Sequence, residues 1–504
     1  MNGQIRRLGV GFAALFLVLF AQAAYVQVVA ADRIANESGN AARQIRAEYE
    51  TQRGAILAAD QSILAESILA PEGSVFRYER RYPKGVLFGH ATGFYSRIFT
   101  RTGLEQAMNP YLAGTAPELA ASNLSDLLLG RPKVGGTVVT TLVPVLQQVA
   151  RAELGGLAGA VVAIDPRTGD VLAMYSNPGY DPNLLSTGTT AEIEAAWDTY
   201  EADPRKPLLS KALGELYLPG STFKIITASA ALENGWGPDK LWDNPRVLDL
   251  PTTGDDLENF GGSLCNGGSR TVSMQEGFVE SCNVTFGSIA LELGADRLAR
   301  QAFDYGFCPI SPPDDVSCSD PPIPFVLPFE SGRFPQPDYF EERTPALAYS
   351  GVGLDNVVTN PLHLALITAA IANGGTMPAP RLVSEVRDPQ GRVVREFAAQ
   401  ILGRPVSTDT AVAMRSLMLQ VVSRGTGSAA QIDGIAVAGK TGTATNGEGR
   451  APNAWFTAFA PAGPGQVPRI AVAVIVLDGG DEGNEATGGR IAAPIARALI
   501  EAAL

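Results

Sequence analysis

Histidine is nearly absent from this chain of 504 residues, which contains only His90 and His363. A catalytic triad with a histidine base, or a histidine metal site, would have to use one of these two residues. His90 falls in an irregular N-terminal stretch and His363 in an apolar helical run, where a lone histidine is usually structural. The scarcity argues against histidine-dependent catalysis, and we expect neither a metal ion nor another cofactor.

Basic residues are also in deficit, with 39 Lys and Arg against 52 Asp and Glu and a formal net charge of −13. No Lys/Arg-rich run occurs, so we expect no nucleic-acid partner. Internal repeats and low-complexity segments are absent as well. The content of 45% hydrophobic and 18% charged residues is typical of a globular protein, and the length allows about three domains.

One long hydrophobic run is present, over residues 8–30, and it directly follows Arg6 and Arg7. As a helix it would span roughly 34 Å, enough for a bilayer core of about 30 Å. The arginines favour a cytoplasmic tail over residues 1–7, a transmembrane anchor over 8–30 and an extracytoplasmic remainder. A cleaved signal peptide is the alternative, because Ala21-Gln22-Ala23 resembles a small-residue cleavage site. In both interpretations, the chain that follows this run lies outside the cytoplasm.

The chain contains four cysteines. If the chain is exported to an oxidising compartment, this even number suggests two disulfides, with three possible connectivities. Pairing neighbours would close the shortest loops, and the first of these would contribute roughly 3 kcal/mol in the chain-entropy model. Buried free thiols are the alternative, and no Cys-x-x-Cys or Cys-His spacing supports a metal site. The candidates are Cys265 with Cys282, and Cys308 with Cys318.

The chain after the anchor divides into two parts by pattern. Residues 31–50 look helical, and from there to about 155 short apolar runs are broken by Gly and Pro, which indicates a mixed pedestal domain over 31–155. Strand patterns then flank a largely helical middle, and a last helix is expected over 491–504. This arrangement predicts an α+β domain over 156–504, with one antiparallel sheet covered by helices on both sides. The expected strands are 160–164, 171–175, 435–443, 454–460 and 469–477.

A Ser-x-x-Lys tetrad, Ser221-Thr222-Phe223-Lys224, precedes a run of helix-forming residues that ends at Asn234-Gly235. If Ser221 opens this helix, Lys224 lies one turn further on the same face, where its amine can activate the hydroxyl. The alternative is an N-cap serine followed by a surface lysine. Two further motifs favour the chemistry, because Ser281-Cys282-Asn283 and Lys440-Thr441-Gly442 follow in order. Ser-x-x-Lys with Ser-Asp-Asn and Lys-Thr-Gly is the signature of penicillin-binding proteins and class A β-lactamases, and here Ser281-Cys282-Asn283 takes the place of Ser-Asp-Asn.

With these motifs the chain resembles a class B penicillin-binding protein over essentially its whole length, most closely the actinobacterial penicillin-binding protein A type. Four shorter segments carry the rest of the resemblance: Arg53-Gly54-Ala55-Ile56, Thr102-Gly103-Leu104-Glu105, Leu112-Ala113-Gly114 and Asn453-Ala454-Trp455-Phe456. In the last, asparagine replaces the usual histidine. The resemblance implies a serine β-lactamase-like transpeptidase domain over 156–504, with a five-stranded antiparallel sheet, flanking helices and a helical subdomain, after a dimerisation-type pedestal. It also implies a peptidoglycan D,D-transpeptidase that cross-links stem peptides, is acylated by β-lactams, and works with cell-division or elongation proteins.

The resemblance also assigns roles on the nucleophile side of the site. Ser221 would attack the penultimate D-Ala carbonyl and form an acyl-enzyme, and Lys224 would have to be neutral to take its proton. A second cation, Lys440, together with desolvation, would lower the pKa of Lys224. Asn283 would orient Lys224 and the substrate amide, and Ser281 would relay the proton to the departing amine.

On the strand side, the backbone N–H groups of Ser221 and Thr443 would form the oxyanion hole. Lys440, Thr441 and Thr443 would hold the terminal carboxylate, and Gly442 would allow close backbone approach. Three other functions stay open. A β-lactamase would need a second base, and no Glu-x-x-Leu-Asn loop lies between the second and third motifs. A D,D-carboxypeptidase differs only in its acyl acceptor, and a non-catalytic scaffold would not need the intact motifs. Cys282 is expected to be structural.

Overall fold

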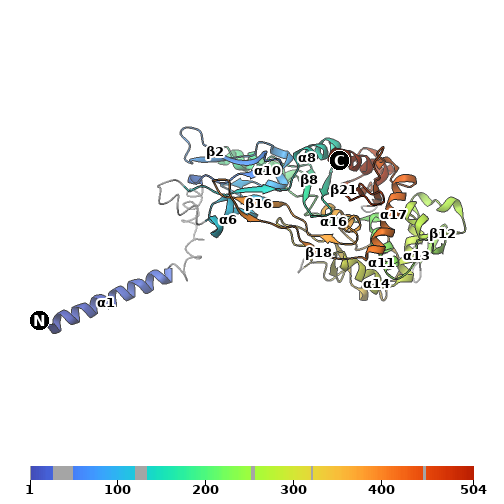
Figure 1. Cartoon of the computed structure of the whole chain (residues 1–504), viewed down its shortest axis with the longest axis horizontal. Helices are drawn as coiled ribbons and strands as arrows, with labels where there is room; N and C mark the ends of the chain where they lie inside the picture. The colour runs from blue at the N-terminus through green and yellow to red at the C-terminus, as the bar shows by residue number, and fades with distance from the viewer. Residues whose placement is uncertain (1, 27–48, 120–132, 251–255, 319–321, 446–449) are drawn as a thin grey trace.

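The computed structural model of the chain describes residues 2–26, 49–119, 133–250, 256–318, 322–445 and 450–504. The helix expected over 31–50 falls almost wholly on residues 27–48, which lie outside the described residues. Helix α1 (Asn2–Ala24) stands apart from the rest of the chain in Figure 1. Its segment Arg6–Ala24 is long and apolar enough to cross a membrane, a test that a signal sequence also passes.

A five-stranded antiparallel sheet forms the centre of the larger lobe, in the order β19-β20-β21-β7-β8. All five strands that the sequence predicts are present, with their ends shifted by a few residues. Every residue of β7, β20 and β21 is buried, because helices cover both faces of the sheet. The strands are β7 (Gly159–Ile164), β8 (Val171–Asn177), β19 (Ala438–Ala444), β20 (Asn453–Ala460) and β21 (Ile470–Val476).

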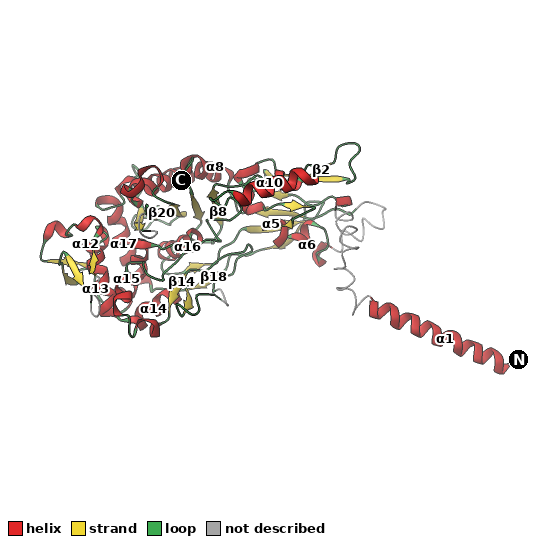
Figure 2. Cartoon of the chain, turned by 180° about the vertical axis from the view of Figure 1, so that it is seen from behind, coloured by secondary structure: helices red, strands yellow, loops and turns green. Residues whose placement is uncertain are grey.

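Helices α8 (Pro144–Leu154) and α18 (Ala493–Ala503) pack together on one face of this sheet, and α16 (Pro361–Ala372) packs on the other. Figure 2 shows α8 and α16 on opposite sides of β8 and β20. Helix α16 is apolar all round and wholly buried, as expected for a helix enclosed by other elements. These layers confirm the predicted α+β fold with its flanking helices.

A helical subdomain beside the sheet surrounds α11 (Lys224–Glu233), which contacts α13 (Asn283–Leu293), α14 (Ala295–Asp304) and α17 (Thr408–Arg424). Most of α11 is buried, including its first residue, Lys224. A helix in this position brings the end of the Ser-x-x-Lys tetrad into the interior, where water cannot stabilise a charge.

A second, six-stranded sheet forms the pedestal, in the order β17-β16-β6-β1-β2-β3. Two of its strands, β16 (Val383–Arg387) and β17 (Val393–Glu396), come from far beyond the expected boundary at residue 155. The other strands are β1 (Ile56–Leu57), β2 (Ile63–Leu69), β3 (Tyr78–Arg81) and β6 (Thr137–Thr140). The sheet therefore includes strands from both sides of that boundary, and the division at 155 stays a prediction.

Three buried charged side chains join the pedestal motifs. Arg53 Nε and Arg80 Nε each donate to one oxygen of the Glu105 carboxylate at 2.6 Å, and Glu105 is wholly buried. Attraction to Arg80 and Arg53 outweighs the burial that would raise the pKa of Glu105, so the pKa is lowered. The carboxylate therefore stays ionised and links β3 to α5 (Gly103–Ala107).

His363 is buried and His90 is partly buried, and ring nitrogens of both contact backbone groups, as expected for structural histidines. His363 Nδ1 accepts the Gly332 N–H at 3.0 Å, and its Nε2 lies 2.8 Å from the Tyr305 carbonyl oxygen. His90 Nε2 lies 2.9 Å from the Pro207 carbonyl oxygen. Burial lowers the pKa of each to about 4, so both rings are neutral at physiological pH.

Candidate active site

A pocket with a volume of about 300 Å³ brings the three motifs together. This volume is within the size range of sites for small ligands. The residues that line the pocket come from the helical subdomain, from the edge strand β19 and from the segment that leads into α18. The predicted residues among them are Ser221, Ser281, Asn283, Thr441, Gly442 and Thr443. Segments more than 200 residues apart in the chain therefore meet at one opening.

Ser221 lies in a 3₁₀ turn, Gly220–Phe223, that leads directly into α11 at Lys224. The sequence predicts a single helix opened by Ser221, and the structure begins this helix with a tighter turn. Gly220 has φ +51°, and a Cβ there would lie 2.4 Å from the Thr443 carbonyl oxygen. Only glycine lets this turn approach β19 so closely.

Lys224 is wholly buried and holds the second motif. Its Nζ donates to Asn283 Oδ1 at 2.8 Å and to the Ser281 carbonyl oxygen at 2.6 Å. Burial, and then repulsion from Lys440, lowers the pKa of Lys224 well below its usual value. The prediction of a neutral base is consistent with this environment, but burial rather than Lys440 is the larger cause.

Lys440 lies on β19 and is also wholly buried. Its Nζ donates to Ser281 Oγ at 2.9 Å and to the Thr441 carbonyl oxygen at 3.1 Å. Burial lowers the pKa of Lys440 to about 7. The Ser281 hydroxyl therefore lies beside both lysines, since Lys224 Nζ is 3.5 Å from the same oxygen.

The expected contact between the Ser221 hydroxyl and the Lys224 amine is not among the hydrogen bonds of the described residues. The Lys224 amine is instead directed to Asn283 and Ser281. Catalytic hydrogen bonds are often long without substrate and shorten when it binds. Ser221 nevertheless lines the same pocket as both of these partners.

The edge strand β19 forms the opposite wall. Thr441 Oγ1 is 2.7 Å from Thr426 Oγ1, and a Cβ at Gly442 would lie 2.8 Å from the Pro219 carbonyl oxygen. Gly442 therefore permits the close approach that the sequence predicts. Pocket residues outside the three motifs were missed, because nothing local in the sequence marks them; they include Asn259, Phe260, Ser263, Glu280, Thr426, Thr487 and Gly489.

The cysteines pair as neighbours, Cys265 with Cys282 and Cys308 with Cys318. This is the shortest-loop connectivity of the three that the sequence allows. Cys282 is 1% exposed, and its bond to Cys265 gives it the structural role that was predicted.

Comparison with known proteins agrees with this geometry. Residues 159–501 match the family model of the penicillin-binding protein transpeptidase domain, and residues 53–138 match that of the penicillin-binding protein A dimerisation domain. The chain is 40% identical to peptidoglycan D,D-transpeptidase PbpA of Mycolicibacterium smegmatis, over 100% of this chain and 99% of the relative. It is 38% identical to the Mycobacterium tuberculosis protein of the same name, with the same coverage.

Solved structures agree as well. Penicillin-binding protein A of M. tuberculosis, determined as a ceftriaxone acyl-enzyme complex, superposes with a TM-score of 0.83 at 38% identity, covering 91% of this chain and 99% of that one. The D,D-transpeptidase domain of a peptidoglycan glycosyltransferase from Eggerthella lenta gives a TM-score of 0.75 at 31% identity, covering 90% and 98%. The chain therefore belongs to the penicillin-binding protein transpeptidase family.

Proposed function

We propose that this chain is a peptidoglycan D,D-transpeptidase that forms an acyl-enzyme on Ser221. The observation that carries the proposal is the environment of Lys224, a buried amine with a lowered pKa that follows directly on the turn holding Ser221, which lines the pocket. A neutral amine in that position is a general base for the serine hydroxyl. The identities of 38–40% to peptidoglycan D,D-transpeptidases support the same assignment.

In the first half-reaction, Ser221 Oγ attacks the penultimate D-Ala carbonyl of a donor stem peptide, and its proton passes to Lys224. The backbone N–H groups of Ser221 and Thr443 stabilise the oxyanion. Ser281, 2.9 Å from Lys440 and 3.5 Å from Lys224, relays a proton to the leaving D-Ala amine as the amide bond breaks. The product is a Ser221 ester and free D-Ala.

Substrate orientation falls to the other predicted residues. Asn283 binds the substrate amide while holding Lys224, and Lys440, Thr441 and Thr443 hold the terminal carboxylate. In the second half-reaction, the amine of an acceptor stem peptide attacks the ester and loses a proton to the Lys224 amine. The ester bond breaks, and Ser221 recovers its hydroxyl proton. β-Lactams acylate the same serine because their ring amide occupies the position of the donor carbonyl.

Membrane attachment is the second part of the proposal. Helix α1 anchors the chain with residues 1–7 in the cytoplasm and the catalytic domain outside, because Arg6 and Arg7 precede the apolar run. The pedestal over 31–155 contacts cell-division or elongation proteins, and the domain over 156–504 carries the chemistry. N-terminal sequencing of the mature protein distinguishes the anchor from a cleaved signal peptide.

One experiment separates the related functions. The purified chain is incubated with a donor ending in D-Ala-D-Ala, with and without an amine acceptor, and the products are separated by mass. D-Ala leaves in both related reactions: a transpeptidase then transfers the donor acyl group to the amine, and a carboxypeptidase transfers it to water alone. In a parallel incubation with penicillin in place of the donor, a β-lactamase would turn the penicillin over. Donor acylation without amine incorporation would contradict the proposed transfer.

The nucleophile has its own test. Ser221→Ala is expected to abolish covalent labelling by a fluorescent penicillin while the thermal unfolding temperature stays close to that of the unmodified chain. Thr222→Ser, in the same turn, is the matched control and should keep its label. Persistent labelling of Ser221→Ala would contradict the assignment.

A further inference from the structure

Ser281 has a backbone conformation that its surroundings must maintain. Its φ is +65°, in the left-handed region that residues other than glycine rarely adopt. Strained residues of this kind persist only where several contacts fix them, and they gather at active sites. The contacts that fix Ser281 therefore also fix the position of its hydroxyl beside the two lysines.

On the inner side, the lysines themselves contact Ser281. Lys224 Nζ donates to its carbonyl oxygen at 2.6 Å, and Lys440 Nζ donates to its hydroxyl at 2.9 Å. Both amines take part in proton movement or substrate binding during the proposed reaction, so these bonds must change within each turnover. A second set of contacts, outside the reacting groups, is needed to keep Ser281 in place.

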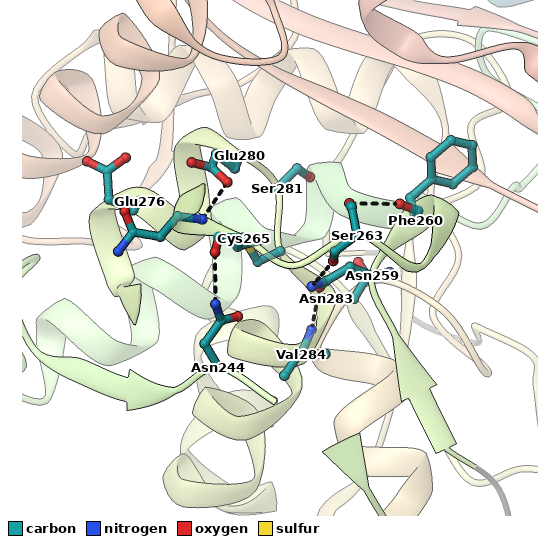
Figure 3. The surroundings of a disulfide bond; sticks show 12 residues. Asn244, Asn259, Phe260, Ser263, Cys265, Glu276, Glu280, Ser281, Asn283 and Val284 are labelled. Carbon is teal, nitrogen blue, oxygen red and sulfur yellow. Dashed lines mark hydrogen bonds between the residues drawn. A yellow bond between two sulfur atoms is a disulfide. The ribbon is translucent and has the colours of Figure 1, made fainter. Parts of the chain in front are cut away.

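On the outer side, the next residue, Cys282, is joined to Cys265 by a disulfide with a Cα–Cα distance of 6.3 Å. Figure 3 shows this bond directly beside Ser281 and Asn283. Both sulfurs belong to buried residues that pack with Val272 in a small cluster of their own. The bond connects the catalytic triplet to the segment Asp256–Gly268, which forms the outer wall of the site.

Hydrogen bonds join the same two segments on either side of the disulfide. They are Asn266 N–H to Glu280 Oε2 at 2.8 Å, Asn283 Nδ2 to the Glu258 carbonyl oxygen at 2.9 Å, and Val284 N–H to Asn259 Oδ1 at 3.0 Å. The outer segment has little regular structure of its own, only the three-residue strand β11 (Asp256–Glu258) and two short 3₁₀ turns. The disulfide is thus the covalent link between two segments otherwise joined by single hydrogen bonds.

The outer segment also lines the pocket. Asn259, Phe260, Ser263 and Cys265 belong to it, and all four are pocket residues. Phe260 is 58% exposed and so depends on the backbone of the segment for its position. One covalent bond therefore connects the pocket wall to the residues that hold the base.

We propose that the Cys265–Cys282 disulfide positions Ser281 and Asn283 for acyl transfer, and that its reduction slows acylation of Ser221 without unfolding the enzyme. The two cysteines act through these neighbours and are positioning residues. The inference rests on the proposed function, because it concerns the rate at which Ser221 is acylated.

Reduction by a dithiol such as dithiothreitol gives a balanced reaction. One thiolate of the reductant attacks a sulfur of the disulfide, and the S–S bond breaks to leave a mixed disulfide and one cysteine thiolate. The second thiol of the reductant then closes its own ring and releases the other cysteine. Two electrons pass to the protein, which gains two thiols, and the reductant becomes a cyclic disulfide. Cys265 lines the pocket, through which a small dithiol can approach.

The second disulfide provides a matched control, because neither Cys308 nor Cys318 lines the pocket. The variants are C265A/C282A and C308A/C318A, each of which keeps one bond; non-reducing peptide mapping verifies the remaining pair. For each variant, the second-order rate constant of acylation by a fluorescent penicillin is resolved into two parts. These are the affinity of the initial non-covalent complex and the rate constant of the acylation step. Thermal unfolding by circular dichroism reports whether the chain stays folded.

We expect C265A/C282A to lose about tenfold to a hundredfold in the acylation rate constant, the range for small displacements of catalytic groups, with a smaller change in affinity. C308A/C318A should acylate within twofold of the unmodified chain. Dithiothreitol should slow C308A/C318A to the level of C265A/C282A and leave the latter unchanged, and reoxidation should restore the rate.

Equal acylation rate constants in both double variants, or no effect of dithiothreitol on C308A/C318A while its bond is shown to be reduced, would overturn the inference. If C265A/C282A does not fold, the reduction and reoxidation of C308A/C318A decide the question alone. Failure of the proposed acyl-enzyme chemistry is distinguishable, because the unmodified, oxidised chain would then not be acylated at all, and the donor experiment with an amine acceptor tests the transfer step separately.

Discussion

The pedestal and the active site both bury positive charge, and they do so in opposite ways. In the pedestal, Arg53 and Arg80 lie on either side of Glu105, and each donates to it at 2.6 Å. In the active site, Lys224 and Lys440 are both wholly buried, and among the described residues neither has a carboxylate partner; they contact carbonyl, amide and hydroxyl oxygens. The same physical situation, a cation removed from water, has two outcomes.

The pedestal cluster fixes charge. Burial alone would lower the pKa of Arg53, but attraction to Glu105 outweighs it and the pKa is raised. In the site no carboxylate opposes the effect of burial. Burial, and then repulsion from Lys440, lowers the pKa of Lys224 well below its usual value, and burial lowers that of Lys440 to about 7. A buried cation with an acid partner is a structural element, whereas one without it can release its proton, which a general base requires.

The largest effect should come from making the active-site charge permanent. In Lys224→Arg the guanidinium cannot lose its proton, so acylation by a fluorescent penicillin should fall by about 10³-fold, within the range for loss of a general base. Stopped-flow labelling measures the rate, and thermal unfolding checks the fold.

Lys211 supplies the control, since it is a buried lysine outside the pocket whose Nζ donates to the Arg205 carbonyl oxygen at 2.8 Å. Lys211→Arg should acylate within twofold of the unmodified chain. A loss below tenfold in Lys224→Arg would mean that another group takes the Ser221 proton.

Removing the acid of the pedestal cluster should affect stability instead of rate. Glu105→Gln leaves two buried arginines without their counter-ion, which typically costs about 3–5 kcal/mol. Urea unfolding in detergent should show this loss, and the folded fraction should acylate at the unmodified rate. An unchanged urea midpoint would mean that the cluster is not needed for stability.

A smaller effect should appear in the pH dependence of acylation. The rate rises with pH as Lys224 loses its proton, because only the neutral amine accepts one from Ser221. Repulsion from Lys440 contributes to the low pKa of Lys224, so Lys440→Gln should raise this pKa and move the acid limb to higher pH. Burial is the larger cause and remains, so the pKa should stay below its usual value.

The pH profile of the second-order rate constant of acylation by penicillin measures this shift, and Lys206→Gln, at an exposed lysine outside the pocket, is the control. An acid limb that stays in place, or that moves to lower pH, would contradict a role for Lys440 in setting the charge of Lys224.

The smallest effect should come from an exposed ion pair. Arg497 Nε and Glu501 Oε1 are 2.9 Å apart on α18, and both side chains are nearly half exposed. Arg497→Ala should change the free energy of unfolding by about 0.5 kcal/mol or less, and leave acylation unchanged. A loss comparable to that of Glu105→Gln would remove the distinction between buried and exposed pairs.

The local parts of this protein could be predicted from its sequence. Turn residues at 165–170 between two apolar runs identify the hairpin β7–β8, and Gly442 marks a position where two backbones approach closely. The neighbouring cysteine pairs follow from the same logic, since short loops close most easily. Pairing across long distances could not be predicted, because β16 is hydrogen-bonded to β6, about 240 residues earlier, with no local signal.

The sequence by itself determined the chemistry available to this protein: a serine, two lysines and an asparagine in three ordered motifs, on elements whose local patterns set their type. The tertiary structure decided the state of these groups. The low pKa of Lys224 comes first from burial by residues of distant helices and strands, and only then from Lys440. Desolvation depends on how many atoms surround a group from all sides, and only the folded chain brings those atoms together.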